Sequence, residues 1–184
     1  MVYPISGISK TKKIAIIGPE STGKTDLTIY LANHFGCPYV EEYARDYIAK
    51  LKRPYQRFDL LKIAQGQIRL EDQYTEDEGK LLICDTNLLV IKIWSNYKYG
   101  DCDGEILKMM ASRNYNLLLL TYIDVPWEYD SQRENEDSRE LLWSIYSKEV
   151  EASKIPYAVI KGSRVERQKI AVEVINKLLE QFQT

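Results

Sequence analysis

Apolar residues along the chain follow two different spacings. Five short stretches are rich in consecutive apolar residues, which is typical of strands buried on both faces: 12–17, 38–41, 80–85, 117–123 and 157–160. Between them, apolar residues recur every three or four positions, as on one face of a helix, at 24–35, 42–51, 58–77, 88–97, 105–112, 141–150 and 170–182. This alternation predicts a three-layer α/β fold, with a parallel sheet of about five strands and helices on both faces.

The domain organisation follows from length and continuity. The chain has 184 residues, and no internal repeat, low-complexity tract or linker interrupts the pattern. Because this length suits one folded unit, residues 1–184 are predicted to form a single domain. A polar, irregular stretch at about 127–140 is predicted to be a small lid.

One loop carries a phosphate-binding motif. Directly after the first apolar stretch, the pattern G-x-x-x-x-G-K-[ST] is matched by Gly18-Pro19-Glu20-Ser21-Thr22-Gly23-Lys24-Thr25. Such a loop surrounds the phosphates of a nucleotide, and the residues assigned to that role are Gly18, Glu20, Ser21, Thr22 and Gly23. Lys24 is expected to hold the β- and γ-phosphates and Thr25 to bind Mg²⁺. The predicted cofactors are therefore ATP and Mg²⁺, and the predicted fold is that of P-loop NTPases.

The polar residues after each strand matter most, because ligands of parallel α/β sheets bind beyond the carboxyl ends of the strands. The second stretch is followed by Glu42, Tyr43 and Arg45. Glu42 is predicted to accept the proton of an attacking hydroxyl, and Arg45 to stabilise developing charge. All three are predicted to bind the acceptor. The alternative is a capped helix start with a solvated acidic first turn.

The third stretch ends in Cys84-Asp85-Thr86-Asn87. A carboxylate at this point is the Walker B arrangement, in which the aspartate holds Mg²⁺ directly or through water. Asp85 is therefore predicted to be catalytic and, with Thr25, to bind the metal. The alternative is that Asp85 only caps the next helix.

Two further segments follow the last two strands. Asp124 and Trp127 are predicted to contact the acceptor, and Arg133 of the lid to neutralise charge during transfer. Trp127 could equally be a packing anchor, and a charge-rich surface loop would look similar to a lid. Ser163 is predicted to flank the adenine, or to cap the last helix with Glu166.

The composition indicates which classes of binding partner are not expected. The chain has 25 basic and 27 acidic residues and no basic stripe, so nucleic acid is not an expected partner. No apolar stretch has the length of a membrane span, and the first residues lack the apolar core of a signal peptide. The three cysteines are scattered, as in proteins with reduced thiols. A cytoplasmic location without membrane association is expected.

Together these motifs resemble the NadR-type P-loop kinases. The resemblance rests on GPESTGKT, EEYAR, CDTN, DVPW with a lid, and KGSRVER, and it spans the chain from about residue 12 to the last helix. It implies that the domain phosphorylates the 5′-hydroxyl of nicotinamide riboside, using ATP and Mg²⁺. Glu42, Tyr43 and Arg45 match the family's Glu-Tyr-x-Arg at the acceptor site, and Asp85 matches the aspartate of its Asp-Thr.

The chain departs from the family pattern in its aromatic residues and its lid. Members that bind nicotinamide carry an aromatic residue before Glu-Tyr, where this chain has Glu41. A second stacking tyrosine comes from the long helix, where the resemblance gives Gln73, with Tyr74 beside it. The lid pattern W-x-x-D-G-x-R keeps its Trp, Asp and Arg in 127–133 but loses its glycine.

These residues predict an ATP- and Mg²⁺-dependent small-molecule kinase. The expected reaction transfers the γ-phosphate to a nucleoside 5′-hydroxyl, with nicotinamide riboside as the leading acceptor. The expected partner is therefore a small nucleoside-like molecule. Two alternatives stay open: a nucleotide-dependent switch or regulatory ATPase without a small acceptor, and a kinase for a sugar or vitamin alcohol.

Overall fold

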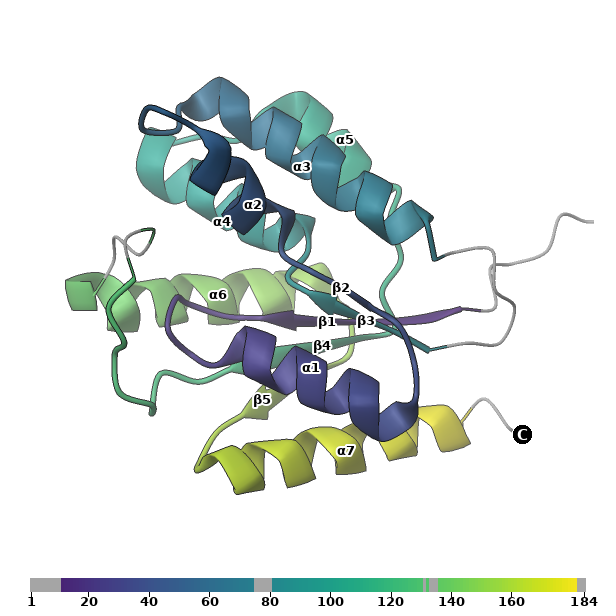
Figure 1. Cartoon of the computed structure of the whole chain (residues 1–184). Helices are drawn as coiled ribbons and strands as arrows, with labels where there is room; N and C mark the ends of the chain where they lie inside the picture. The colour runs from purple at the N-terminus through teal and green to yellow at the C-terminus, as the bar shows by residue number, and fades with distance from the viewer. Residues whose placement is uncertain (1–10, 75–80, 131, 133–135, 182–184) are drawn as a thin grey trace, which may run out of the picture.

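The computed structural model describes residues 11–74, 81–130, 132 and 136–181. One sheet runs through it, made of β1 (Lys12–Ile17), β2 (Tyr39–Val40), β3 (Leu81–Asp85), β4 (Leu117–Thr121) and β5 (Tyr157–Ile160). The strand order is β2-β3-β1-β4-β5, so β1 and the loop after it occupy the centre (Figure 1). All neighbouring strands are parallel, which confirms the predicted five-stranded parallel sheet.

Helices cover both faces of this sheet (Figure 1). One face carries α1 (Lys24–Phe35) and α7 (Arg164–Glu180), and the other carries α4 (Leu88–Tyr99) and α6 (Arg139–Ser153), which a short 3-10 turn (Glu136–Ser138) precedes. A further group packs on α4, namely α2 (Tyr43–Lys50), α3 (Arg57–Asp72) and α5 (Gly104–Ala111). Within the described ranges, no helix is long and apolar enough to cross a membrane. The predicted three-layer α/β fold is confirmed.

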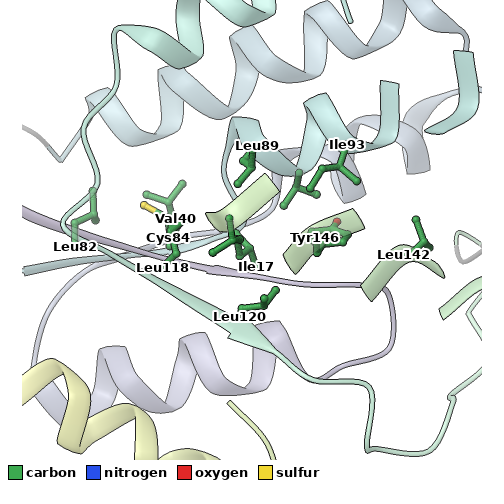
Figure 2. Packing of buried hydrophobic residues seen from close by; sticks show 13 residues of the cluster. Ile17, Val40, Leu82, Cys84, Leu89, Ile93, Leu118, Leu120, Leu142 and Tyr146 are labelled. Atoms are coloured by element: carbon green, nitrogen blue, oxygen red, sulfur yellow. The ribbon is translucent and has the colours of Figure 1, made fainter. Parts of the chain in front are cut away.

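The core divides along each central strand. Ile14 and Ile16 of β1 pack with α1 and α7, whereas Ala15 and Ile17 pack with α4 and α6. Strands β3 and β4 divide in the same way, because consecutive side chains of a strand point to opposite faces. Figure 2 shows the cluster on the face covered by α4 and α6, where Leu89, Ile93, Leu142 and Tyr146 pack against the strands. Burial on both faces is why these strands appear in the sequence as unbroken apolar stretches.

Most element boundaries differ from the prediction by a few residues, and those of α3, β4 and α7 are the most informative. Helix α3 ends at Asp72, and residues 75–80, which include the predicted end of this helix, lie outside the described ranges. Strand β4 ends at Thr121, two residues before the end that its apolar pattern predicted. Helix α7 begins at Arg164, ahead of the apolar stripe that starts at residue 170, because Ser163 and Glu166 form a capping box at its start.

The carboxyl end of α3 lies at the edge of the sheet where the strands begin. Glu71 is fully buried there and accepts a hydrogen bond from the Tyr115 hydroxyl at 2.7 Å. Its carboxylate also pairs with Lys13 of β1, with 3.5 Å between Nζ and Oε2. The loop after β1 leaves from the opposite edge of the sheet, at the left in Figure 1. Residues at the end of α3 are therefore remote from that loop.

Candidate nucleotide and acceptor site

A cleft of about 640 Å³ opens over the loop that follows β1. Its lining comes from that loop and the start of α1, from α2 and α4, from the segment 125–132, and from the start of α7. The polar and aromatic side chains on this lining include Glu20, Ser21, Thr22, Lys24, Thr25, Glu42, Arg45, Trp94, Glu128, Gln132, Arg164, Arg167 and Gln168. Eight residues that the sequence assigned to the site are among the lining: Glu20, Ser21, Thr22, Gly23, Lys24, Thr25, Glu42 and Arg45.

The loop is held against the end of β4 by close packing. Gly18 has φ 144°, and a Cβ atom there would lie 2.8 Å from the carbonyl oxygen of Thr121, so only glycine fits. The hydroxyls of Thr22 and Thr121 share a hydrogen bond of 2.7 Å, and Thr22 also donates to the Pro19 carbonyl at 2.8 Å. The Thr22 side chain is buried, so its hydroxyl bonds stabilise the loop from its protein-facing side.

The loop backbone has the form of an anion-binding nest. Ser21 and Gly23 both adopt left-handed conformations, with φ of 53° and 77°. Residues that alternate between left-handed and right-handed backbone turn successive N–H groups toward one point, and α1 adds the positive end of its dipole directly after Gly23. The Lys24 ammonium donates to the Pro19 carbonyl at 2.9 Å, which keeps this charge over the loop.

A hydroxyl and a buried carboxylate meet beside the loop. The Thr25 hydroxyl donates to Asp85 Oδ2 at 2.5 Å, and Asp85 is 2% exposed. Burial raises the pKa of Asp85, while the Thr25 hydrogen bond and the Lys24 charge lower it. Asn87, not Asp85, caps α4 by accepting from the Leu89 N–H at 3.1 Å, which excludes the capping alternative for Asp85.

These two side chains fit a magnesium ion. Asp85 Oδ1 is buried and has no hydrogen-bond partner within the described residues, so an oxygen ligand is available next to the Thr25 hydroxyl. Oxygen atoms of this kind are the ligands that Mg²⁺ prefers, usually together with water and phosphate. The following residue, Thr86, has φ 76°, which is uncommon for a β-branched residue. Strained backbone of this kind is often found at functional sites.

Glu42 lies at the start of α2, facing the charges of the loop. It occupies the position before the first helical residue but makes no capping hydrogen bond. Burial raises the pKa of this carboxyl, as do Asp85 and Glu20, whereas the nearby charges of Lys24 and Arg45 lower it. The alternative of a solvated acidic cap therefore does not describe Glu42, which is a half-buried carboxylate among other charges.

Arg45 lies one turn further along α2 and contacts the segment over the cleft. Its guanidinium pairs with Asp130, with 3.1 Å between Nη2 and Oδ2. The side-chain Nε2 of Gln132 donates to the Arg45 carbonyl at 3.3 Å. The backbone N–H of Glu128 donates to the Ser21 hydroxyl at 2.8 Å. This segment therefore bridges the loop and α2. Arg133, which was predicted to be catalytic, lies outside the described residues.

Three predicted acceptor contacts lie outside the cleft lining. The Tyr43 ring packs on α3 over Gly66, where any side chain would collide with it. Trp127 lies beside Arg139, 5.8 Å from ring centre to guanidinium carbon, at the base of the covering segment. The Asp124 carboxylate accepts from the Gly162 N–H at 2.6 Å and pairs with Arg167. Each of these side chains therefore has a contact within the protein in place of a position on the lining.

Ser163 likewise does not line the cleft. Its hydroxyl donates to Glu166 Oε2 at 2.7 Å, and the same carboxylate oxygen accepts from the Ser163 N–H at 2.8 Å. The capping interpretation therefore describes the Ser163 side chain. The neighbouring residues Arg164, Arg167 and Gln168 are the ones that reach the lining.

The aromatic residue of the cleft is one that the sequence did not indicate. Trp94 of α4 lies on the lining with Glu42, and its side chain also packs against the buried cluster that contains Tyr146. Gln73, where the resemblance places the family's second stacking ring, follows Asp72 at the edge where the strands begin and is not on the cleft lining. No local motif marks Trp94, since its helical spacing is that of an ordinary core residue.

A glycine-rich loop between a central parallel strand and a helix, with an aspartate ending the neighbouring strand, defines the P-loop class. The profile of one family, described as an AAA domain (AAA_28), matches residues 13–167. The chain belongs to this AAA-domain family.

Two comparisons confirm the resemblance to NadR-type P-loop proteins. The trifunctional NAD biosynthesis/regulator protein NadR of Escherichia coli K12 is 27% identical over 128 residues, which cover 66% of this chain and 31% of that protein. A crystal structure of NadR in complex with NR superposes with a TM-score of 0.78 at 19% identity, over 92% of this chain and 50% of that one. The chain thus spans about a third of the length of its curated relatives.

The fold is also that of smaller kinases. Deoxyadenosine kinase from M. mycoides, with dCMP and dCDP bound, matches with a TM-score of 0.63 at 15% identity, over 90% of this chain and 99% of that one. At such identity the likeness concerns the fold alone. It shows that the P-loop fold of this chain is shared with chains of similar length.

Proposed function

We propose that the chain is an ATP- and Mg²⁺-dependent kinase that transfers the γ-phosphate to the 5′-hydroxyl of a nucleoside, with nicotinamide riboside as the leading acceptor. The observation that carries this proposal is the position of Glu42, a carboxylate that shares the cleft with Lys24 and Arg45. A hydroxyl acceptor needs a base beside the phosphate site, and the nest of the loop is suited to phosphates.

On the donor side, the loop N–H groups and Lys24 hold the phosphates of ATP. Lys24 exchanges its bond to the Pro19 carbonyl for a phosphate oxygen. Thr25 and Asp85 would hold Mg²⁺, which would supply positive charge beside the phosphates. Arg164 and Gln168 line the same cleft and lie beside the nucleotide.

On the acceptor side, Glu42 takes the proton of the attacking hydroxyl. Its raised pKa brings it closer to neutrality than an ordinary glutamate, which improves a general base that works near pH 7. Arg45 balances the charge that develops on the transferred group. Phosphoryl transfer depends mainly on positioning and electrostatics, so this set of groups is sufficient in kind.

The ring of the acceptor lies against Trp94. Its indole packs against the buried cluster that contains Tyr146, which restrains the ring at the cleft. A flat nucleobase or pyridine ring stacks on such a surface. NadR has been crystallised in complex with NR and with NAD and AMP-PNP, which supports a nicotinamide nucleoside as the first acceptor to test.

The proposal is tested by ADP release from the full chain with ATP, Mg²⁺ and a panel of nucleosides. One nucleoside, with nicotinamide riboside tested first, is expected to stimulate ADP release strongly, and a Lys24→Ala variant is expected to lose the stimulated rate. A rate that stays flat across the panel would reject the nucleoside-kinase proposal and favour the regulatory ATPase. Stimulation by a sugar or vitamin alcohol alone would change the acceptor class.

A further inference from the structure

Two arginines from different helices bond to consecutive carbonyls of the loop. Arg139, the first residue of α6, donates from Nη2 to the Ser21 carbonyl at 3.2 Å. Arg167, in the first turn of α7, donates from Nη1 to the Thr22 carbonyl at 2.7 Å. Neither role was visible in the sequence, because both contacts join segments more than 100 residues apart.

The geometry of the peptide unit gives these bonds a consequence. A trans peptide is planar, with its carbonyl oxygen and its N–H on opposite sides. When Arg139 and Arg167 hold the carbonyls of Ser21 and Thr22, the N–H groups of Thr22 and Gly23 must point the other way. We propose that Arg167, assisted by Arg139, is a positioning residue that holds the loop in its phosphate-binding form before any phosphate arrives.

The Arg167 guanidinium is well suited to this role because it is itself immobilised. Arg167 is 6% exposed, and its Nε donates to the Gly162 carbonyl at 2.9 Å. Its Nη2 donates to the Tyr122 carbonyl at 2.8 Å and pairs with Asp124. The Arg167 side chain therefore connects the loop to the end of β4 and to the turn before α7. Lysine could not make these divergent bonds, since its donors sit on one atom.

Strain in the loop indicates why outside support is needed. Ser21 is held at φ 53°, a conformation that L-residues with a Cβ avoid. Two contacts from other segments hold it there: the bond from Arg139 to its carbonyl, and the bond from the Glu128 N–H to its hydroxyl. Strained backbone of this kind persists only where the surroundings enforce it.

The inference rests on the proposed phosphate site, and the experiment separates the two. Inorganic tripolyphosphate with Mg²⁺ serves as the probe, titrated calorimetrically into the full chain. Arg167→Lys is expected to raise its Kd by about tenfold or more, as for the loss of one oriented charge-assisted bond. If the native chain binds no tripolyphosphate, the phosphate site itself fails; if native and variant bind alike, only the positioning role fails.

A backbone measurement distinguishes positioning from direct contact with the anion. In the absence of any anion, the amide resonances of Thr22 and Gly23 are expected to shift in Arg167→Lys. Unchanged resonances in the free variant, with weaker binding, would mean that Arg167 only touches the phosphate, which overturns the proposal.

A variant of an arginine far from the loop serves as the control for general loss of stability. Arg113 pairs with Asp72 at the opposite edge of the sheet, so Arg113→Lys is expected to lower the unfolding temperature while leaving the tripolyphosphate Kd within about twofold. A similar loss of binding in that variant would show a general effect of instability and reject the proposal. If Arg167→Lys does not fold, Arg139→Lys decides by the same amide shifts of Thr22 and Gly23.

Discussion

At the scale of single residues, Glu42 differs from its neighbour Glu41 in its surroundings alone. Glu42 is half-buried on the cleft lining, with Lys24 and Arg45 nearby, while Glu41 is exposed and outside the lining. Two adjacent glutamates thus form a natural test pair, because the same substitution changes the same charge at a site and beside it.

Glu42→Gln is expected to leave ATP binding nearly intact and to slow transfer by ~10²–10⁴-fold, the usual contribution of a general base. Steady-state kinetics with the identified acceptor, together with calorimetric ATP binding, measures the two effects. Glu41→Gln is the matched control and should change neither by more than about twofold. Loss of ATP binding in Glu42→Gln would instead indicate a structural or metal-binding role.

The acidic limb of the rate profile offers a second test of Glu42. A general base must be ionised, and burial raises the pKa of Glu42 above its ordinary value of 4.5. The native rate should therefore fall, as pH decreases, from a higher pH than an unperturbed glutamate would allow. Glu42→Gln should lack this limb, and a variant profile parallel to the native one would assign the limb to another group.

Asp85→Asn is expected to raise the Mg²⁺ concentration needed for half-maximal rate by about 10–100-fold, the range for losing a group that supports a metal. The reason is that Asp85 provides the buried carboxylate beside Thr25. Asp72→Asn removes a carboxylate at the far edge of the sheet and should leave the Mg²⁺ dependence unchanged. A lower rate with unchanged Mg²⁺ dependence would mean that Asp85 is structural.

At the scale of elements, one buried carboxylate of α3 helps to hold α2 in place. Asp59 of α3 is fully buried and accepts from the Tyr47 hydroxyl of α2 at 2.8 Å and from two nitrogens of Arg53 at 2.7 and 3.0 Å. It also completes the cap of α3 through the Gln56 N–H at 2.8 Å. Because α2 carries Glu42 at its start, this carboxylate also supports the site.

Asp59 makes stability depend on pH in a defined direction. The hydrogen bonds from Arg53, followed by those from Gln56 and Tyr47, lower the pKa of Asp59 although burial opposes them. A lowered pKa contributes stability that is present above the unfolded value near 4 and is lost as pH falls through it toward the folded value. Native stability should therefore decline on acidification partly through Asp59.

Asp59→Asn is expected to lower the free energy of unfolding by about 2–4 kcal/mol at pH 7, since it removes the charge from a buried network. Urea unfolding at pH 7 and near pH 3 measures the effect, and the difference from the native chain should shrink at the lower pH. Asp101→Asn, at an exposed pair with Arg57, should change stability by less than about 1 kcal/mol. A difference independent of pH would assign the loss to packing.

The elements could largely be predicted from sequence, and the site only in part. Strands β1, β3 and β4 appeared as apolar stretches because both of their faces are buried. Residues at or just beyond the carboxyl ends of strands, such as Asp85 and Glu42, could be predicted because chain position alone places them at the ligand edge. Trp94 and Arg167 could not, because they reach the cleft from within helices whose placement depends on tertiary packing.

At the scale of the whole molecule, the cleft is assembled from segments that are distant in sequence. Its lining comes from the loop, α2, α4, the segment 125–132 and α7. Arg167 joins α7 to the loop, and Asp130 joins the segment 125–132 to α2. The distance of Gln73 from the cleft could not be predicted for the same reason, since a position on a long helix does not tell which edge of the sheet it reaches.

The central claim is that the γ-phosphate moves to an acceptor and not to water. The most direct measurement follows the label of γ-³²P-ATP in a single turnover with the full chain, Mg²⁺ and nicotinamide riboside. The label is expected to appear in a nucleoside 5′-phosphate. Label found only as inorganic phosphate, with this and every other nucleoside, would contradict it.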